Sequence, residues 1–207
     1  MALNSPEPRK TSEALVEITL EMIDDRGGLY GLNLREIARE AGCAHTNVYN
    51  YFDSFDGLVL AALKALLNRL ISFTQEKIEP GRVEEEAYLE VFLAAQIDFA
   101  LAHPGWYHFM WFDKSADVEA DPELLRIFEF LASAFNEKVY FHYGRAMEKG
   151  KADEIGDMLH GLLHGEICKL ISGRGIKISK AEYRERILAD CRALLAAFAP
   201  DGKGAAK

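Results

Sequence analysis

Polar and aromatic side chains gather between positions 45 and 51, and their types suit contacts with DNA. Asn pairs bidentately with adenine, and the hydroxyl and methyl groups of Thr can contact thymine. Tyr hydroxyl groups suit the phosphate oxygens of the backbone. A place in the core of a small domain is the alternative for Tyr51, and we favour it for Phe52. We predict contacts with double-stranded DNA for Arg35, His45, Thr46, Asn47, Tyr49, Asn50 and Tyr51.

Two short helices with a tight turn between them would position this set. Asn33 suits the N-cap of the first helix, and Glu36 is placed to be its reciprocal partner in a capping box. Apolar residues at positions 34, 37, 38 and 41 form one helical face. Gly42 ends that helix, and the second helix is predicted over about His45 to Tyr51. This is the helix-turn-helix pattern, whose second helix can lie in the major groove.

The same stretch resembles the DNA-binding domain of the tetracycline-repressor (TetR) family of bacterial transcription regulators. The matching residues are Leu34-Arg35-Glu36-Ile37-Ala38, Ala41-Gly42, Val48-Tyr49-x-Tyr51-Phe52, Ser54 and Leu58. The specific part of the resemblance covers about the first 65 residues. It implies an all-α fold with an N-terminal three-helix helix-turn-helix domain and a C-terminal helical bundle that binds ligand and dimerises.

Two residues depart from the family pattern. The family commonly has Ser or Thr at the N-cap of the recognition helix, where this chain has Ala44. That change costs roughly 1 kcal/mol of capping. The family also commonly has a Lys that meets a DNA phosphate where this chain has Phe55. Backbone amides at that helix start can still bind an anion, so the departures concern the strength of DNA binding.

The charge balance also bears on DNA binding. The net charge is −9, and residues 1–57 carry five cations against ten anions. Only charges within about a Debye length of a phosphate, ~8–10 Å, count strongly. Arg9, Lys10, Arg35 and Arg39 would have to form a basic edge. We therefore predict modest DNA affinity that falls with added salt.

Composition excludes several classes of protein. Hydrophobic residues make up 49% of the 207 residues and charged residues 28%, as in a globular domain. The N-terminus lacks a signal-peptide core, and no apolar run of membrane-spanning length is expected. Three cysteines without CxxC spacing disfavour a disulfide framework or a structural zinc site. We expect a cytoplasmic protein, no membrane partner, no cofactor and no enzyme activity, since nucleophile-elbow and phosphate-loop motifs are missing.

The rest of the chain has helical periodicity with short breaks, and no useful strand alternation. A helix capped by Ser54 is predicted to reach about Ile78, where it would connect two domains. Further helices are predicted over about 84–102, 106–112, 123–149, 153–172 and 180–199, the last with a Ser179–Glu182 capping box. The expected organisation is 1–57 for DNA binding, 58–80 for the connecting helix, 81–200 for the bundle and 201–207 for a disordered tail.

Aromatic residues concentrate in the middle of the predicted bundle. Residues 99–143 hold 12 of the 22 aromatic residues in the chain. A bulky core explains most of them, but a pocket for an apolar or aromatic small molecule would have the same composition. The predicted ligand-binding residues are Trp106, Tyr107, Met110, Trp111, Phe128 and Tyr140.

Two features near the C-terminus suggest contacts between helices. His160 and His164 share a helix face at a spacing that can chelate a metal, but the HExxH signature is missing and each precedes a glycine. We therefore favour close helix packing and predict no metal site. Broad apolar faces on the last two helices predict a homodimer. Its predicted interface comprises Leu159, Leu163, His164, Ile167, Leu188 and Leu195.

These patterns favour a homodimeric, ligand-responsive transcription regulator. The expected activity is repression, relieved when a small apolar or aromatic effector releases the dimer from a palindromic operator. The alternative is a helical ligand-binding or protein-docking module with weak or lost DNA binding. The sequence does not identify the effector, the operator or the regulated genes.

Overall fold

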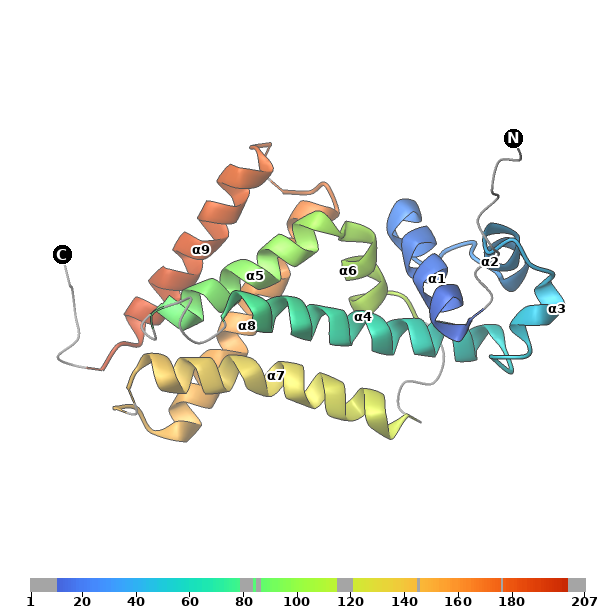
Figure 1. Ribbon diagram of the computed structural model, residues 1–207. Coiled ribbons are helices and arrows are strands. Elements are labelled where there is room, and N and C mark those ends of the chain that lie inside the picture. The colour runs from blue at the N-terminus through green and yellow to red at the C-terminus, as the bar shows by residue number, and fades with distance from the viewer. Residues whose placement is uncertain are drawn as a thin grey trace. The chain divides into compact units, whose positions relative to one another are not determined.

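The computed structural model describes residues 11–78, 84, 87–114, 121–144, 146–175 and 177–200. Within these ranges the chain forms helices and no strand, which confirms the predicted all-α class (Figure 1). The helices are α1 (Ser12–Arg26), α2 (Leu34–Glu40), α3 (His45–Val48), α4 (Phe55–Lys77), α5 (Tyr88–Ala102), α6 (Pro104–Trp111), α7 (Pro122–His142), α8 (Lys149–Ile171) and α9 (Lys180–Ala197).

The chain divides into two compact units whose boundaries differ from the predicted ones. The N-terminal unit comprises Met1–Arg69 with His103–Leu124, and the C-terminal unit comprises Leu70–Ala102 with Leu125–Lys207. α6 therefore belongs with the helix-turn-helix rather than with the bundle, because it packs against α1. The prediction made 58–80 a separate connecting helix, and α4 contributes residues to both units, which divide between Arg69 and Leu70. The predicted tail, 201–207, lies outside the described residues.

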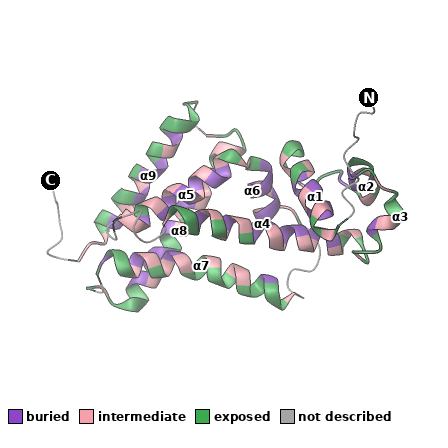
Figure 2. Ribbon diagram, in the orientation of Figure 1, coloured by how far each residue is buried: buried purple, intermediate pink, exposed green. Residues whose placement is uncertain are grey.

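Local signals set the helix ends of the N-terminal unit. Thr11 Oγ1 accepts a hydrogen bond from Ala14 N at 3.2 Å and so caps α1. Gly27 ends the same helix with φ of 74°, a left-handed conformation that glycine adopts without strain. Ser54 Oγ accepts a hydrogen bond from Gly57 N at 3.0 Å at the start of α4, as predicted. Buried apolar side chains line the inner faces of these helices (Figure 2).

α4 is apolar enough, by length and composition alone, to cross a membrane. This finding differs from the expectation that the chain has no such run. Core helices of soluble proteins meet the same criterion, and Leu58, Ala62 and Leu66 of α4 are fully buried. The helix also carries Lys64, whose Nζ lies 2.8 Å from Asp121 Oδ2. Buried contacts and this ion pair favour the assignment of α4 as a core helix.

Side-chain contacts connect α5 and α9 along the C-terminal unit. Arg184 Nε donates to Asp98 Oδ1 at 2.6 Å, and Arg192 donates to Glu90 at 2.7 Å. The predicted capping box of Ser179 and Glu182 starts α9, with both of its hydrogen bonds present. The predicted helix over 123–149 is too long: α7 ends at His142, and Gly144 follows with φ of 61°.

Candidate DNA-binding surface and ligand cavities

Backbone capping and a glycine turn hold the helix-turn-helix together. Asn33 Oδ1 accepts hydrogen bonds from Arg35 N at 3.1 Å and Glu36 N at 3.2 Å, as its predicted role as N-cap requires. Glu36 does not take the predicted role of reciprocal partner: its Oε2 pairs with the Arg26 guanidinium at 3.0 Å. Gly42, with φ of 67°, then turns the chain toward α3.

α3 is shorter than predicted. It spans His45–Val48, and the amides of Tyr51 and Phe52 both donate to the Val48 carbonyl at 3.0 Å in the turn that follows. Ala44 occupies the N-cap position. Because its methyl side chain has no acceptor atom, it makes no cap hydrogen bond. Val48 is fully buried, so its side chain packs the short helix against the rest of the unit.

Most residues predicted to contact DNA are available for contact. Tyr49 is 52% exposed and Tyr51 is 46% exposed, so a core position for Tyr51 is not what the structure shows. Phe52 is half-buried. Four other candidates are exposed, namely Arg35, His45, Thr46 and Asn50, whereas Asn47 is half-buried. One end of the unit therefore presents hydroxyl, amide and imidazole groups together, which are the groups that read base edges and phosphates.

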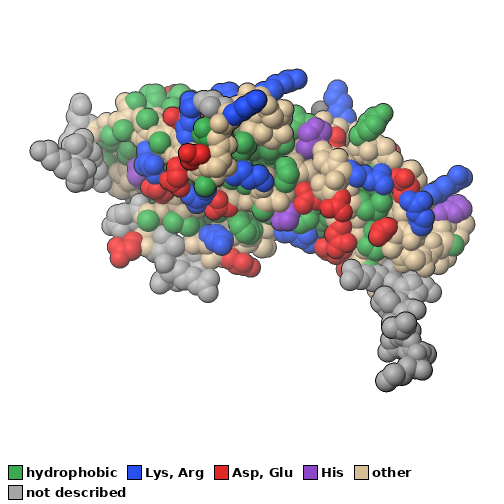
Figure 3. Space-filling model, turned by 90° about the horizontal axis from the view of Figure 1, so that it is seen from above, with side chains coloured by type: hydrophobic (Ala, Val, Ile, Leu, Met, Phe, Trp, Pro, Cys, Tyr) green, Lys and Arg blue, Asp and Glu red, His purple; other side chains and the backbone are tan. Residues whose placement is uncertain are grey.

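Two arginines on α2 form the described part of the predicted basic edge. Arg35 and Arg39 are exposed and lie four residues apart, so they share a helix face. Neither forms an ion pair within the described residues, and the pairing of Arg26 with Glu36 neutralises one nearby carboxylate. Arg9 and Lys10 lie outside the described residues. On the face seen in Figure 3, Lys and Arg side chains are interspersed with Asp and Glu side chains rather than forming one basic field.

The missing N-cap of α3 gives a first prediction. Ala44→Ser would supply an acceptor for a free amide of α3 and is expected to stabilise the N-terminal unit by about 1 kcal/mol. Because α3 is so short, DNA affinity is expected to rise a few-fold as well. Denaturant unfolding and DNA titration measure the two effects. Ala44→Val, which adds bulk without an acceptor, is the control, and equal behaviour of the two variants would contradict the prediction.

The six predicted ligand-binding residues lie on two helices that belong to different units. Trp106, Tyr107 and Met110 are buried on α6 in the N-terminal unit, where Trp106 Nε1 donates to the Leu20 carbonyl at 2.7 Å. Trp111 also lies on α6, whereas Phe128 and Tyr140 lie on α7 in the other unit. The set stays a prediction, and an aromatic helix that packs against α1 has the same sequence signature as a pocket wall. Of the six, only Tyr140 lines a cavity described below.

A small cavity in the C-terminal unit has the character expected of an effector site. Its volume is about 190 Å³. Most of its wall is apolar, and one hydrogen-bonded polar pair lies within it: Gln96 Nε2 donates to Thr74 Oγ1 at 2.9 Å. Thr74 is one of two buried polar side chains among the described residues. The lining residues are Ile71, Thr74, Gln75, Ile78, Phe92, Gln96, Phe130, Leu131, Ala134, Glu137 and Lys138.

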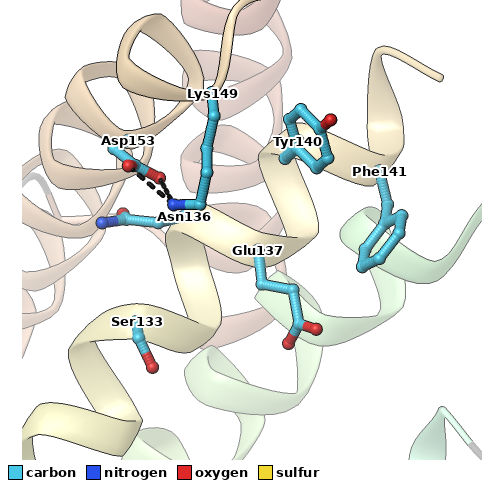
Figure 4. Close-up of a pocket in the computed structure, with 7 residues that line it drawn as sticks. All are labelled: Ser133, Asn136, Glu137, Tyr140, Phe141, Lys149 and Asp153. Carbon is cyan, nitrogen blue, oxygen red and sulfur yellow. Dashed lines mark hydrogen bonds and ion pairs between the residues drawn. The ribbon is translucent and has the colours of Figure 1, made fainter. Parts of the chain in front are cut away.

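Two larger hollows lie in the same unit. One, of about 510 Å³, lies between α7 and the start of α8 (Figure 4). There Lys149 Nζ is 2.9 Å from Asp153 Oδ2, so the two charges satisfy each other. The other, of about 550 Å³, lies among α5, the end of α7 and α9, beside the ion pair of Glu90 and Arg192. Tyr143 closes its floor, and its hydroxyl donates to the Leu195 carbonyl at 2.6 Å.

The two histidines of α8 take part in packing. The His160 ring stacks on Phe135 with centroids 4.5 Å apart. Burial lowers the pKa of His160, and burial followed by the neighbouring His160 lowers the pKa of His164. Neutral imidazoles could bind a metal, but the described residues contain no group of three or more His, Cys, Asp or Glu side chains able to hold one.

Five of the six predicted dimer residues face the interior of their own chain. Leu159, Leu163, Ile167, Leu188 and Leu195 are all buried, and His164 is half-exposed. Helical periodicity marks an inner face without showing what covers it, so the dimer interface stays a prediction. The outward faces of the same helices carry small side chains. We call this surface the α8–α9 outer face: Met158, Gly161, Gly165, Cys168, Ala189, Ala193 and Ala197.

Comparisons with known proteins agree with this geometry. No family model matches the chain. The HTH-type transcriptional regulator BetI of Burkholderia cenocepacia is 27% identical over 155 residues, which cover 73% of this chain and 77% of that protein. A TetR-family transcriptional regulator from Streptomyces coelicolor aligns with a TM-score of 0.67 at 19% identity, over 91% of this chain and 85% of that one. A Rhodococcus sp. RHA1 protein with unknown function aligns with a TM-score of 0.78 at 20% identity, over 95% and 100% of the two chains.

The two kinds of likeness complement each other. The solved structures show the fold, and the sequence relatives are helix-turn-helix transcriptional regulators. Both agree with an exposed α2–α3 surface that carries groups suited to DNA. The chain therefore has the fold of TetR-family regulators and resembles HTH-type transcriptional regulators over 73% of its length.

Proposed function

We propose that this protein is a ligand-responsive repressor that binds a palindromic operator as a homodimer. The exposed surface formed by α2 and α3, with Arg35 and Arg39 at its edge, carries this proposal. A short recognition helix reads few base pairs, so two copies on adjacent half-sites would supply the specificity. We expect the protein to act in the cytoplasm, where its operator would be accessible.

Release would follow from a shift between two states of the dimer. Effector bound in the C-terminal unit would favour a spacing of the two recognition helices that no longer matches adjacent major grooves. The effector needs only a differential affinity for the two states, and a tenfold preference corresponds to about 1.4 kcal/mol.

The cavity beside Thr74 and Gln96 is our candidate effector site. Its apolar residues and the hydrogen-bonded pair of Thr74 and Gln96 suit a small, neutral, mostly aromatic molecule with one hydrogen-bonding group, and Gln75, Glu137 and Lys138 complete the lining. The volume of about 190 Å³ restricts the ligand to a small molecule unless neighbouring side chains move.

A filling substitution tests this site. Ala134→Trp is expected to occupy the cavity and abolish the rise in melting temperature that small neutral aromatic compounds give the wild-type protein. A ligand at 100 times its dissociation constant stabilises a protein by about 2.7 kcal/mol, so the wild-type shift is measurable by thermal denaturation. Ala132→Trp, at an exposed α7 position, is the control. If the ligand raises the melting temperature of Ala134→Trp as much as that of the wild-type protein, this cavity is not the effector site.

The basic edge of α2 gives a test of DNA contact. The double variant Arg35→Ala/Arg39→Ala is expected to bind DNA at least tenfold more weakly. It is also expected to reduce the slope of log affinity against log salt by about 1.8, or about 0.9 for each lost phosphate contact. Arg126→Ala, at an exposed arginine of α7, should leave both quantities unchanged. If the slope of log affinity against log salt does not change, Arg35 and Arg39 do not contact DNA phosphates.

The central experiment is selection of bound fragments from the organism's own sheared DNA, at low and at physiological salt. Enrichment of one palindromic site is expected, and the spacing of its half-sites would report the geometry of the dimer. The uncapped α3 and the acidic balance favour one alternative, a ligand-binding module with little DNA affinity. No enrichment, even after denaturation and refolding to remove a bound ligand, would support that alternative.

A further inference from the structure

The largest cavity described above lies in the C-terminal unit, and the proposed function does not use it. It is the hollow of about 550 Å³ among α5, the end of α7 and α9, which we call the α5–α9 hollow. α5 and α9 lie side by side in this unit (Figure 1). Small-molecule sites in proteins usually have volumes of about 300–1,000 Å³. The α5–α9 hollow is therefore large enough for a ligand of its own.

Aliphatic side chains form the apolar part of the wall of the α5–α9 hollow. Leu89 and Leu93 come from α5, and Leu188 and Leu195 come from α9. Tyr143 adds a phenol ring, and its hydroxyl donates to the Leu195 carbonyl at 2.6 Å, so this polar group is already satisfied. A wall of this kind stabilises a bound alkyl chain by removing apolar surface from water.

The polar side chains of the lining belong to Glu90, Arg192 and His142. Arg192 Nη1 donates to Glu90 Oε1 at 2.7 Å, and within the described part of the chain the Arg192 side chain has no second ion pair or hydrogen bond. A guanidinium has five N–H donors. The donors on Nε and Nη2 are therefore left for an acceptor that the described residues do not supply.

A carboxylate is the group that best matches these donors. It accepts two parallel N–H groups of a guanidinium, and such charge-assisted hydrogen bonds are stronger than neutral ones. We propose that the α5–α9 hollow binds an aliphatic monocarboxylate of medium chain length, with its chain on the leucines and its carboxylate on Arg192. Glu90 opposes this binding, because it has the same charge as the ligand and competes for the same guanidinium. The inference depends neither on DNA binding nor on the effector cavity beside Thr74.

Sodium octanoate is the probe for this site. 1-Octanol has the same chain without a charge, and octylammonium chloride has it with the opposite charge. Titration calorimetry of the full-length protein is expected to show that octanoate binds at least tenfold more tightly than either control. A tenfold ratio corresponds to about 1.4 kcal/mol, within the range for hydrogen bonds to charged groups.

Two substitutions at the ion pair should change the octanoate affinity in opposite directions. Arg192→Gln is expected to weaken binding at least tenfold, whereas Glu90→Gln is expected to strengthen it several-fold. Both variants break the same ion pair, so a purely structural role of the pair would give changes of the same sign. The two side chains are 48% and 54% exposed, and such pairs contribute little to stability, so both variants should fold. Arg186→Gln, at an exposed arginine of α9 outside the lining, is the matched control.

A filling substitution locates the bound octanoate. Ala196 lies in the lining of the hollow, and Ala196→Trp is expected to abolish octanoate binding while the response to small neutral aromatic compounds remains. Ala134→Trp should show the converse, so failure of this proposal is distinguishable from failure of the proposed effector site. The proposal is overturned if octanoate does not bind at millimolar concentration or if 1-octanol or octylammonium binds as tightly. Wild-type octanoate affinity of Arg192→Gln or Ala196→Trp would also overturn it.

Discussion

Gly156→Ala is expected to destabilise the protein by about 2–3 kcal/mol, within the upper range for an added methyl group in a packed interior. Gly156 is a buried residue of α8, and a Cβ there would lie 2.2 Å from Asn136 Oδ1 and 2.7 Å from Asn136 Cα. Rotation of the Asn136 side chain cannot relieve the second contact, because that atom belongs to the backbone. α7 and α8 would have to move apart, which weakens the packing around both helices.

The same substitution elsewhere on α8 is the matched control. Gly150 has no atom within 4 Å of an added Cβ, so Gly150→Ala should leave stability unchanged or raise it slightly. Denaturant unfolding at one fixed protein concentration compares the two, since stability of a dimer depends on concentration. Equal stability of the two variants would mean that α7 and α8 do not approach as closely as the structure shows.

Ala193→Glu is expected to abolish dimerisation and to weaken operator binding roughly 100-fold or more, because one half-site contact would then be lost. Ala193 lies on the α8–α9 outer face, whose residues are exposed or half-exposed, most of them small, and recur at helical spacing on each helix. Added Cβ atoms at Gly161 and Gly165 would meet nothing within 4 Å, so this side of α8 is open for close approach by another helix. A carboxylate placed there would be desolvated by the partner without a counter-charge.

Light scattering at micromolar concentration measures the loss of dimerisation, and DNA titration measures the loss of operator affinity. Ala181→Glu, at an exposed position in the first turn of α9, carries the same charge change away from the outer face. It should remain a dimer with wild-type operator affinity. A dimeric Ala193→Glu protein would place the association surface elsewhere.

Few local interactions stabilise α3. The recognition helix is four residues long and has no side-chain N-cap, so its order comes from the burial of Val48 and from the turn that follows it. Burial raises the pKa of the Cys191 thiol to about 12, so that cysteine is unreactive at neutral pH.

The sequence alone determined the features that depend on neighbours three or four residues away. The caps at Asn33, Ser54 and Ser179 and the glycine turn at Gly42 all form as predicted. Each needs only one side chain and one nearby amide, or one residue free to adopt a positive φ. The TetR resemblance rests on the same short stretch, which explains why the fold class could be predicted.

The tertiary structure alone decided which helix covers which. Periodicity showed that α6 and α8 have apolar faces, but it could not show that Trp106 packs on α1 or that Leu159 is buried within its own unit. The hydrophobic effect is non-directional, so an apolar face has the same pattern whether it meets a core, a ligand or a second copy of the chain. Only the positions of Leu20 and the other partners distinguish these cases, and long-range packing sets those positions.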